Sequence, residues 1–121
     1  MIPKVIYQTW KTQNIHKNIY KLHKKMLKEN PEYQQIIYTD DQMFDFVKSN
    51  YDKNIFNYFE RINNIVSRAD FWRYLILYKN GGVYLDIDSI IEGNLSEIID
   101  ENDDALITAE KNENCFAQWS L

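Results

Sequence analysis

Apolar and polar residues along the first third of the chain follow patterns typical of a strand, a helix and a second strand. The segment 4–9 predicts the first strand. Over residues 15–28, apolar side chains recur at helical spacing with lysines between them, and Asn30-Pro31 ends this helix. The segment 33–38 predicts the second strand. The chain therefore begins with a strand, a helix and a strand in succession.

The following segments predict more helices and then further strands. Asp40 or Asp41 can cap a helix that runs through Val47, and another helix covers about 52–62. A helix over about 65–79 ends at Asn80-Gly81, a common helix-stop signal. We then expect a strand over 81–89, a short helix near 96–99 and a strand over 105–109.

This alternation predicts the fold class, which is an α/β sandwich around a largely parallel sheet. A chain of 121 residues is long enough to bury a core, and we expect one domain over 1–121. In such sheets ligands bind beyond the carboxyl ends of the strands. Asp86 and Asp88 lie at such an end.

Composition excludes several classes of partner. The formal net charge is −4 without a basic block, so we expect no nucleic-acid partner. No window approaches the roughly 18 apolar residues that a membrane span needs. Met1 runs almost directly into a strand, which leaves no room for a signal peptide. Cys115 is the only cysteine, and this favours a reducing compartment. We therefore expect a cytoplasmic protein.

The strand over 81–89 carries two carboxylates on an otherwise apolar segment. Val83, Leu85 and Ile87 alternate with the second set of side chains, Tyr84, Asp86 and Asp88. Because side chains alternate across a strand, both aspartates share one face. An ionised carboxylate costs several kcal/mol to desolvate unless it is paired or bound to a metal. The pattern therefore indicates a cation or a ligand nearby.

The spacing of the two aspartates restricts how they can hold a cation. Residues i and i+2 of a strand lie about 6.6 Å apart, whereas metal–oxygen bonds are about 2.1 Å long. We therefore expect one aspartate to coordinate directly and the other to act through water or a substrate hydroxyl. Oxygen ligands favour Mg²⁺ or Mn²⁺ over zinc, and phosphate oxygens commonly complete their shells. On spacing alone, an exposed strand end that merely keeps acidic residues in water explains the pair equally well.

The helix over 65–79 is apolar nearly all round, which predicts that it is buried. Asp70 and Arg73 stand at i and i+3, where they can pair. One interpretation is a buried ion pair. The other is that both side chains lean into the metal cleft, where arginine contacts phosphate or sugar oxygens and aspartate accepts hydrogen bonds from hydroxyls.

Trp10, at the end of the first strand, can stack on a nucleobase or simply pack at the rim.

Two segments carry a resemblance to a known family. Residues 2–10 read IPKVIYQTW and residues 67–88 read SRADFWRYLILYKNGGVYLDID. Together they resemble glycosyltransferases whose sugar-binding region contains a DXD motif. This family includes yeast-type initiating mannosyltransferases and bacterial capsular transferases, and it is more distantly similar to clostridial glucosylating toxins. A weaker similarity lies at Asn114-Cys115-Phe116.

The resemblance implies a GT-A-like fold, a divalent metal, usually Mn²⁺ with Mg²⁺ as an alternative, and a UDP- or GDP-sugar donor. It implies retaining transfer of the sugar to a glycan or another hydroxyl acceptor. Asp86 and Asp88 would be the catalytic pair, with Asp88 as the direct ligand and Asp86 binding ribose and metal-bound water. The implied donor-binding residues are Gln8, Thr9, Trp10, Asp70, Arg73, Gly82 and Tyr84.

The chain departs from the family in length, because family catalytic domains are about twice as long. A truncated module that binds nucleotide-sugar without transferring it, alone or until a partner completes it, is therefore the alternative. A third interpretation is an interaction module, in which a homodimer forms through the apolar C-terminal segment around Phe116 and Trp119.

Overall fold

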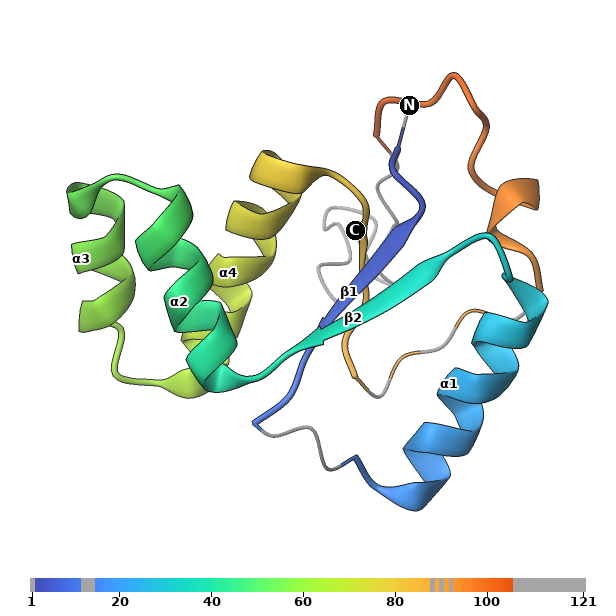
Figure 1. Cartoon of the computed structure of the whole chain (residues 1–121), viewed down its shortest axis with the longest axis horizontal. Coiled ribbons are helices and arrows are strands. Elements are labelled where there is room, and N and C mark those ends of the chain that lie inside the picture. The colour runs from blue at the N-terminus through green and yellow to red at the C-terminus, as the bar shows by residue number, and fades with distance from the viewer. Residues whose placement is uncertain (1, 12–14, 88, 90, 92, 106–121) are drawn as a thin grey trace, which may run out of the picture.

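A computed structural model describes residues 2–11, 15–87, 89, 91 and 93–105 (Figure 1). Within these ranges the elements occur in the order β1 (Val5–Thr9), α1 (Lys17–Glu29), β2 (Gln34–Tyr38), α2 (Asp40–Asn50), α3 (Lys53–Arg61), α4 (Ile65–Asn80), β3 (Val83–Tyr84) and the 3-10 helix η1 (Leu95–Glu97). The expected strand at 105–109 and the apolar segment around Phe116 and Trp119 lie outside the described residues.

The described strands form a parallel sheet in the order β2-β1-β3. Tyr7, in the central strand, is in register with Ile36 on one side and Tyr84 on the other. The pairing of β1 with β3 ends where the Leu85 amide donates to the Tyr7 carbonyl at 3.1 Å. The expected α/β class with a parallel sheet is confirmed, although the regular strand within 81–89 is only two residues long.

Helices cover both faces of this sheet. Figure 1 shows α2, α3 and α4 on one side of the strands and α1 on the other. The core on the first side contains Tyr7, Met43, Phe46, Val47, Phe59, Trp72, Leu75, Ile76 and Tyr84. The core on the α1 side contains Ile6, Met26, Tyr33, Val83, Leu85 and Leu95. The predicted alternation along β3 is therefore confirmed for the described residues, since Tyr84 and its neighbours Val83 and Leu85 enter different cores.

The N-cap of helix α2 lies one residue before the first of the two expected caps. Thr39 is the N-cap, and its side chain accepts from the Gln42 amide while the Gln42 side chain accepts from the Thr39 amide. The prediction of Asp40 or Asp41 as the cap was wrong, because both already lie in the first turn, where their charges favour the helix dipole. Such a cap contributes about 1 kcal/mol.

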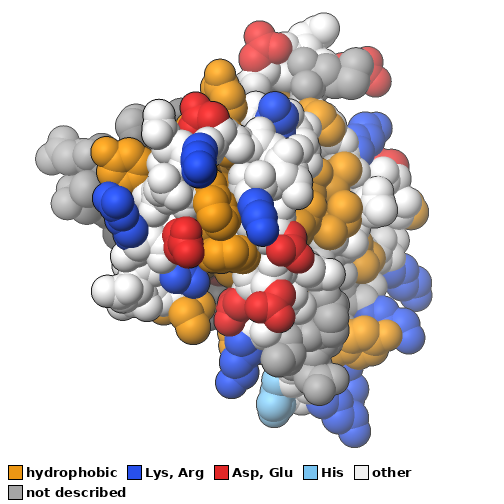
Figure 2. Space-filling model, turned by 60° about the vertical axis from the view of Figure 1, so that its left-hand side comes forward, with side chains coloured by type: hydrophobic (Ala, Val, Ile, Leu, Met, Phe, Trp, Pro, Cys, Tyr) orange, Lys and Arg blue, Asp and Glu red, His pale blue; other side chains and the backbone are white. Residues whose placement is uncertain are grey.

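Helix α4 is less buried than its composition predicts. Trp72 and Ile76 are fully buried, but Val66 and Tyr78 are 68% and 86% exposed. The prediction of burial all round was wrong, because α4 packs against α2 and β3 while Val66 and Tyr78 on its surface stay exposed. Figure 2 shows hydrophobic side chains lying between charged ones on the helical side of the molecule. Among the described helices, none is both long and apolar enough to cross a membrane.

Gly81 and Gly82 join α4 to β3 in conformations that other residues rarely adopt. Their φ angles are 68° and 99°. A Cβ on Gly82 would lie 2.9 Å from the carbonyl oxygen of Val5, and one on Gly81 would lie 2.9 Å from a side-chain carbon of Pro3. The two glycines therefore let the chain reverse from the helix directly into close contact with β1.

We predict that Gly82→Ala lowers the free energy of unfolding by more than Gly93→Ala does. Both glycines have positive φ, but a Cβ on Gly93 meets no atom within 4 Å. Gly93→Ala therefore introduces backbone strain of about 1 kcal/mol, whereas Gly82→Ala adds a clash with the backbone of β1 and should cost about 2–4 kcal/mol. Urea denaturation of both variants measures the difference. Equal losses would contradict the close approach at Gly82.

Candidate functional site

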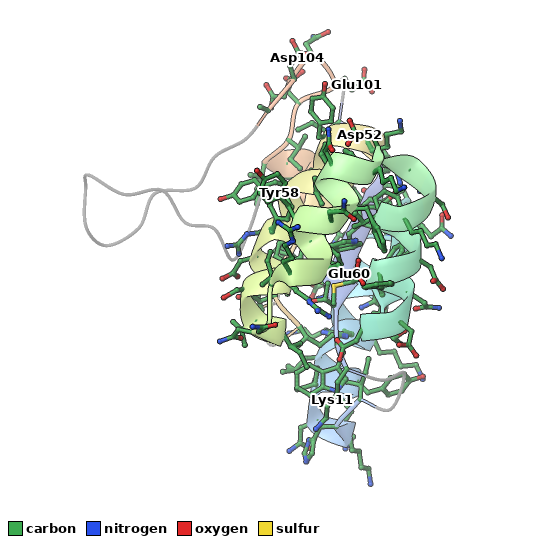
Figure 3. All side chains as sticks on the ribbon, turned by 90° about the vertical axis from the view of Figure 1, so that its left-hand side faces the viewer. Lys11, Asp52, Tyr58, Glu60, Glu101 and Asp104 are labelled. Atoms are coloured by element: carbon green, nitrogen blue, oxygen red, sulfur yellow. The ribbon has the colours of Figure 1, made fainter. Side chains whose placement is uncertain are left out.

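The candidate site lies at the carboxyl ends of β1 and β3. Because Tyr7 is in register with Tyr84, continuing the same register by two residues places Thr9 beside Asp86. Figure 3 shows Lys11, just beyond β1, at the opposite end of the molecule from Glu101 and Asp104. Thr9 and Asp86 therefore lie at one edge of the sheet, where ligands of parallel sheets usually bind.

Tyr84 connects the strand to the first aspartate of the motif. Its ring is 2% exposed, and its hydroxyl donates to Oδ1 of Asp86 at 3.0 Å. Burial raises the pKa of Tyr84 well above its ordinary value of 10, and the negative charge of Asp86 raises it further. A hydrogen bond with Thr9 and the positive charge of Arg73 act in the opposite direction. Tyr84 is therefore a neutral donor that fixes the orientation of the Asp86 carboxylate.

Arg73 brings a buried positive charge from α4 to the same cluster. The residue is 5% exposed, and its guanidinium carbon lies 5.8 Å from the ring centre of Tyr84 and 5.5 Å from that of Tyr74. Its Nη2 pairs with Oδ1 of Asp70 at 3.2 Å. Cation–π contacts with the two rings hold the guanidinium group in place, which suits an arginine that binds carboxylate or phosphate oxygens.

The Asp70–Arg73 pair forms as expected but is not a buried ion pair. The Asp70 side chain is 56% exposed, whereas the Arg73 side chain is only 7% exposed. Water therefore screens the Asp70 charge, and the contact stabilises the fold little. The structure thus shows the ion pair of the first interpretation, with Arg73 buried and Asp70 at the solvent edge, and a role of the two side chains in ligand binding stays a prediction.

Two of the expected donor-binding residues lie away from this cluster. The Gln8 side chain is fully buried on the α1 face of the sheet, opposite to Tyr84. Gly82 precedes β3, at the other end of the strand from Asp86, where its space is limited by Val5 and Tyr7. Trp10, in contrast, follows the carboxyl end of β1 and is partly exposed, and its amide extends the sheet by donating to the Tyr38 carbonyl at 3.1 Å.

Of the two motif aspartates, the structure describes Asp86, whose oxygens are donors of the kind that a hard divalent cation prefers. Asp86 supplies carboxylate oxygens at the strand end, while Asp88 lies outside the described residues. The nearest histidine, His23, is on the opposite face and uses Nε2 on the carbonyl of Ile87. In the described part of the chain no three His, Cys, Asp or Glu side chains group as a metal cage. An oxygen site with few protein ligands suits Mn²⁺ or Mg²⁺, whose shells include water and phosphate.

Sequence reasoning missed His23, which contacts the segment of the aspartates. It stands four residues after Ile19 and three before Met26, on the apolar stripe of α1, and is 3% exposed. A polar residue on an otherwise apolar helix stripe was the available signal. Its partner could not be identified, because Ile87 is 64 residues further along the chain.

Comparisons with known proteins agree on one family. The model of the "Glycosyltransferase sugar-binding region containing DXD motif" matches residues 7–105. Inositol phosphoceramide mannosyltransferase 3 of Schizosaccharomyces pombe is 41% identical over 87 residues, which are 72% of this chain and 24% of that protein. An uncharacterized glycosyltransferase of Acanthamoeba polyphaga mimivirus is 30% identical over 121 residues, covering 98% of this chain and 47% of its own.

Two further comparisons concern a mannosyltransferase and a solved structure. The initiation-specific alpha-1,6-mannosyltransferase of Candida albicans is 32% identical over 94 residues, which are 73% of this chain and 24% of that protein. The structure of the PaToxG glycosyltransferase matches with a TM-score of 0.57 and 24% identity, over 77% of this chain and 44% of that one. This likeness supports the expected GT-A-like fold. The chain thus spans between a quarter and a half of these proteins, and the single-domain boundary stays a prediction.

We predict that Tyr84→Phe makes the protein less sensitive to alkaline pH. The raised pKa means that folded Tyr84 keeps its proton after the unfolded chain has lost it. Its contribution to stability is therefore complete below about pH 10 and is lost as pH rises further, by up to about 1.4 kcal/mol per pH unit. Urea denaturation between about pH 9 and 11 should show a shallower loss for Tyr84→Phe than for the unaltered protein.

The matched control is Tyr58→Phe, which removes a hydroxyl from a residue that is 69% exposed. This variant should keep the steeper alkaline loss. Identical slopes in the unaltered protein and Tyr84→Phe would contradict a buried, protonated Tyr84.

Proposed function

Because the chain belongs to the family of glycosyltransferases whose sugar-binding region contains a DXD motif, we propose that it binds a nucleotide-sugar through a divalent cation at Asp86 and Asp88. The observation that carries this proposal is the cluster of Tyr84, Asp86 and Arg73 at the carboxyl edge of the sheet. It combines a positioned carboxylate with a buried guanidinium, which are the groups needed for a cation–diphosphate pair.

Each residue of the cluster has a separate role in the proposal. Asp88 is the direct ligand of Mn²⁺ or Mg²⁺, and Asp86 binds the ribose and a metal-bound water. When bound, the metal neutralises the charge on the departing diphosphate. Arg73 and Asp70 contact oxygens of the donor sugar and phosphates, while Thr9 and Tyr84 line the donor site. Trp10 packs against the base, since its partly exposed indole lies at the same edge.

The proposed reaction is transfer of the sugar with retention at the anomeric carbon. The bond from this carbon to the diphosphate oxygen breaks, and the diphosphate leaves with the electron pair. The acceptor hydroxyl oxygen forms the new bond, and its proton passes to the released diphosphate or to water. The acceptor is a glycan or another hydroxyl compound. Several relatives are named as mannosyltransferases, so a mannosyl donor is the first to test.

The alternative is a module that binds the donor without transferring the sugar alone. We keep this alternative because the chain spans only 24% of one mannosyltransferase relative and 47% of the viral glycosyltransferase. Both functions use the same donor site, so they differ in turnover rather than in binding.

We predict that the chain hydrolyses at least one nucleotide-sugar slowly in the presence of Mn²⁺. Water replaces the acceptor at the anomeric carbon when the donor site is intact. A panel of UDP- and GDP-sugars, with GDP-mannose first, is incubated with the protein, and the released nucleotide is assayed. Asp86→Asn should lower the rate at least tenfold. Asp45→Asn, an equal charge change on the exposed side of α2, should leave it unchanged.

Nucleotide binding without release from any donor would support the non-transferring module. The absence of both would contradict the proposed function.

We further predict that Asp88→Ala weakens Mn²⁺-dependent binding of the nucleotide while hardly changing its binding in the presence of EDTA. Loss of a direct ligand removes the link between the protein and the cation, and a loss of about tenfold to a hundredfold is expected. Calorimetric titration with UDP and with GDP measures both affinities. An unchanged affinity in Mn²⁺ would show that Asp88 is not a ligand.

A further inference from the structure

Three polar side chains form a buried network on the α1 face of the sheet. Gln8 of β1 is fully buried and His23 of α1 is 3% exposed, while Gln35 of β2 is half-buried. Gln35 Nε2 donates to Gln8 Oε1 at 2.5 Å and lies 3.1 Å from Nδ1 of His23. This network occupies the face opposite to Tyr84 and Arg73, so its polar groups point away from the proposed donor.

The network ends on two backbone carbonyls of the motif segment. His23 Nε2 lies 2.8 Å from the carbonyl oxygen of Ile87, and Gln8 Nε2 donates to that of Asp86 at 3.4 Å. A carbonyl oxygen only accepts, so the proton of neutral His23 is on Nε2. Nδ1 is then free of a proton and accepts from Gln35. The 3.5 Å contact between Gln8 Nε2 and His23 Nε2 brings two donors together and adds no hydrogen bond.

The hydrogen bonds of Gln8 and His23 begin just after the regular pairing of β3 with β1. The regular pairing of β1 with β3 reaches Tyr84, and one further backbone bond joins the Leu85 amide to the Tyr7 carbonyl. The next two carbonyls, those of Asp86 and Ile87, are held by side chains instead. Gln8 and His23 therefore extend the support of the backbone by two residues, through the middle of the Asp-Ile-Asp motif.

The same helix also holds the chain beyond the motif. The Asn30 side chain is fully buried after the end of α1 and donates to the Gly93 carbonyl at 2.9 Å. Its Oδ1 accepts from the Leu95 amide at 2.6 Å. Helix α1 and its cap therefore attach to the chain at residue 87 and again at residues 93 and 95. Apolar packing alone would not fix the backbone at these points, because it is not directional.

We propose that His23, supported by Gln8 and Gln35, is a positioning residue that fixes the backbone of the Asp-Ile-Asp motif for binding of the metal and the nucleotide. This inference rests on the proposed function and deepens it. The buried side chains of Gln8 and His23 cost more than an apolar filling of the same space, unless their hydrogen bonds are all made. The benefit is a fixed geometry of the motif. Groups that orient the ligands of a metal commonly change metal affinity by about tenfold to a hundredfold.

The test compares His23→Leu with His23→Gln. Leucine fills a similar volume without a donor, so Mn²⁺-dependent affinity for UDP or GDP should fall about tenfold. The amide of glutamine can donate to Ile87 and accept from Gln35, so this variant should stay within about threefold of the unaltered protein. Calorimetric titration measures both, and EDTA controls show that the loss concerns the metal-dependent part of binding.

A destabilised control separates positioning from a general loss of stability. Val47→Ala removes buried volume from the core on the other face of the sheet and should lower the melting temperature without changing nucleotide affinity. If His23→Leu does not fold, Gln35→Leu on the half-buried edge strand removes the partner of Nδ1 and should weaken binding in the same direction by a smaller factor.

Nitrogen NMR gives a readout that does not depend on any ligand. The chain has two histidines, and His16 is exposed, so the buried imidazole can be assigned with a His16→Gln variant. The expected signature of His23 is the tautomer with the proton on Nε2. A proton on Nδ1 alone would overturn the inference.

Equal metal-dependent affinity in the unaltered protein and His23→Leu would overturn the inference while leaving the proposed function in place. If the unaltered protein binds no nucleotide with Mn²⁺, both fail together.

Discussion

The parallel pairing of β1 with β3 is the constraint on which the rest of the structure depends. It places Tyr7 beside Tyr84 and so determines on which face of the sheet each side chain after β3 lies. Only two residues of β3 form regular sheet, and the entry at Gly81 and Gly82 allows the close approach to β1 because neither glycine carries a Cβ. The alternation of a strand then sends Tyr84 toward α4 and Leu85 toward α1. A shift of one residue would exchange these faces and turn the Asp86 carboxylate away from Tyr84 and Arg73.

Much of the arrangement follows from local rules that can be read from sequence. Periodicity located all four α-helices and all three strands of the described ranges, because each pattern depends on neighbours within a few residues. The spacing of Asp70 and Arg73 on one helix was likewise sufficient to predict their ion pair. Thr39 was missed as a cap because Asp40 and Asp41 are equally good candidates in isolation, and only the bonds with Gln42 decide between them.

What the sequence did not predict depends on contacts between distant segments. The solvent exposure of Tyr78 follows from which neighbours α4 has, and its own composition says nothing about them. Gln8 lies in the segment that resembles the family. Strand alternation nevertheless directs its side chain to the α1 face, where it contacts His23. For Arg73 the sequence left an ion pair and a position in a cleft open; Tyr74 is its neighbour in α4, but the ring of Tyr84 comes from β3, and only the fold brings it to the guanidinium.

The two faces of the sheet contribute different things to one edge. On the α4 face, Tyr84 and Arg73 determine the direction and electrostatic surroundings of the Asp86 carboxylate. On the α1 face, His23 acts on the carbonyl of Ile87 and so on the path of the backbone. The orientation of a metal-binding side chain and the path of its backbone can vary independently. The end of a strand fixes both only if each face of the sheet supplies a residue that holds it. Because α1 is distant from the aspartates in the sequence and α4 almost directly precedes them, the fold assembles the site from a distant support and a local one.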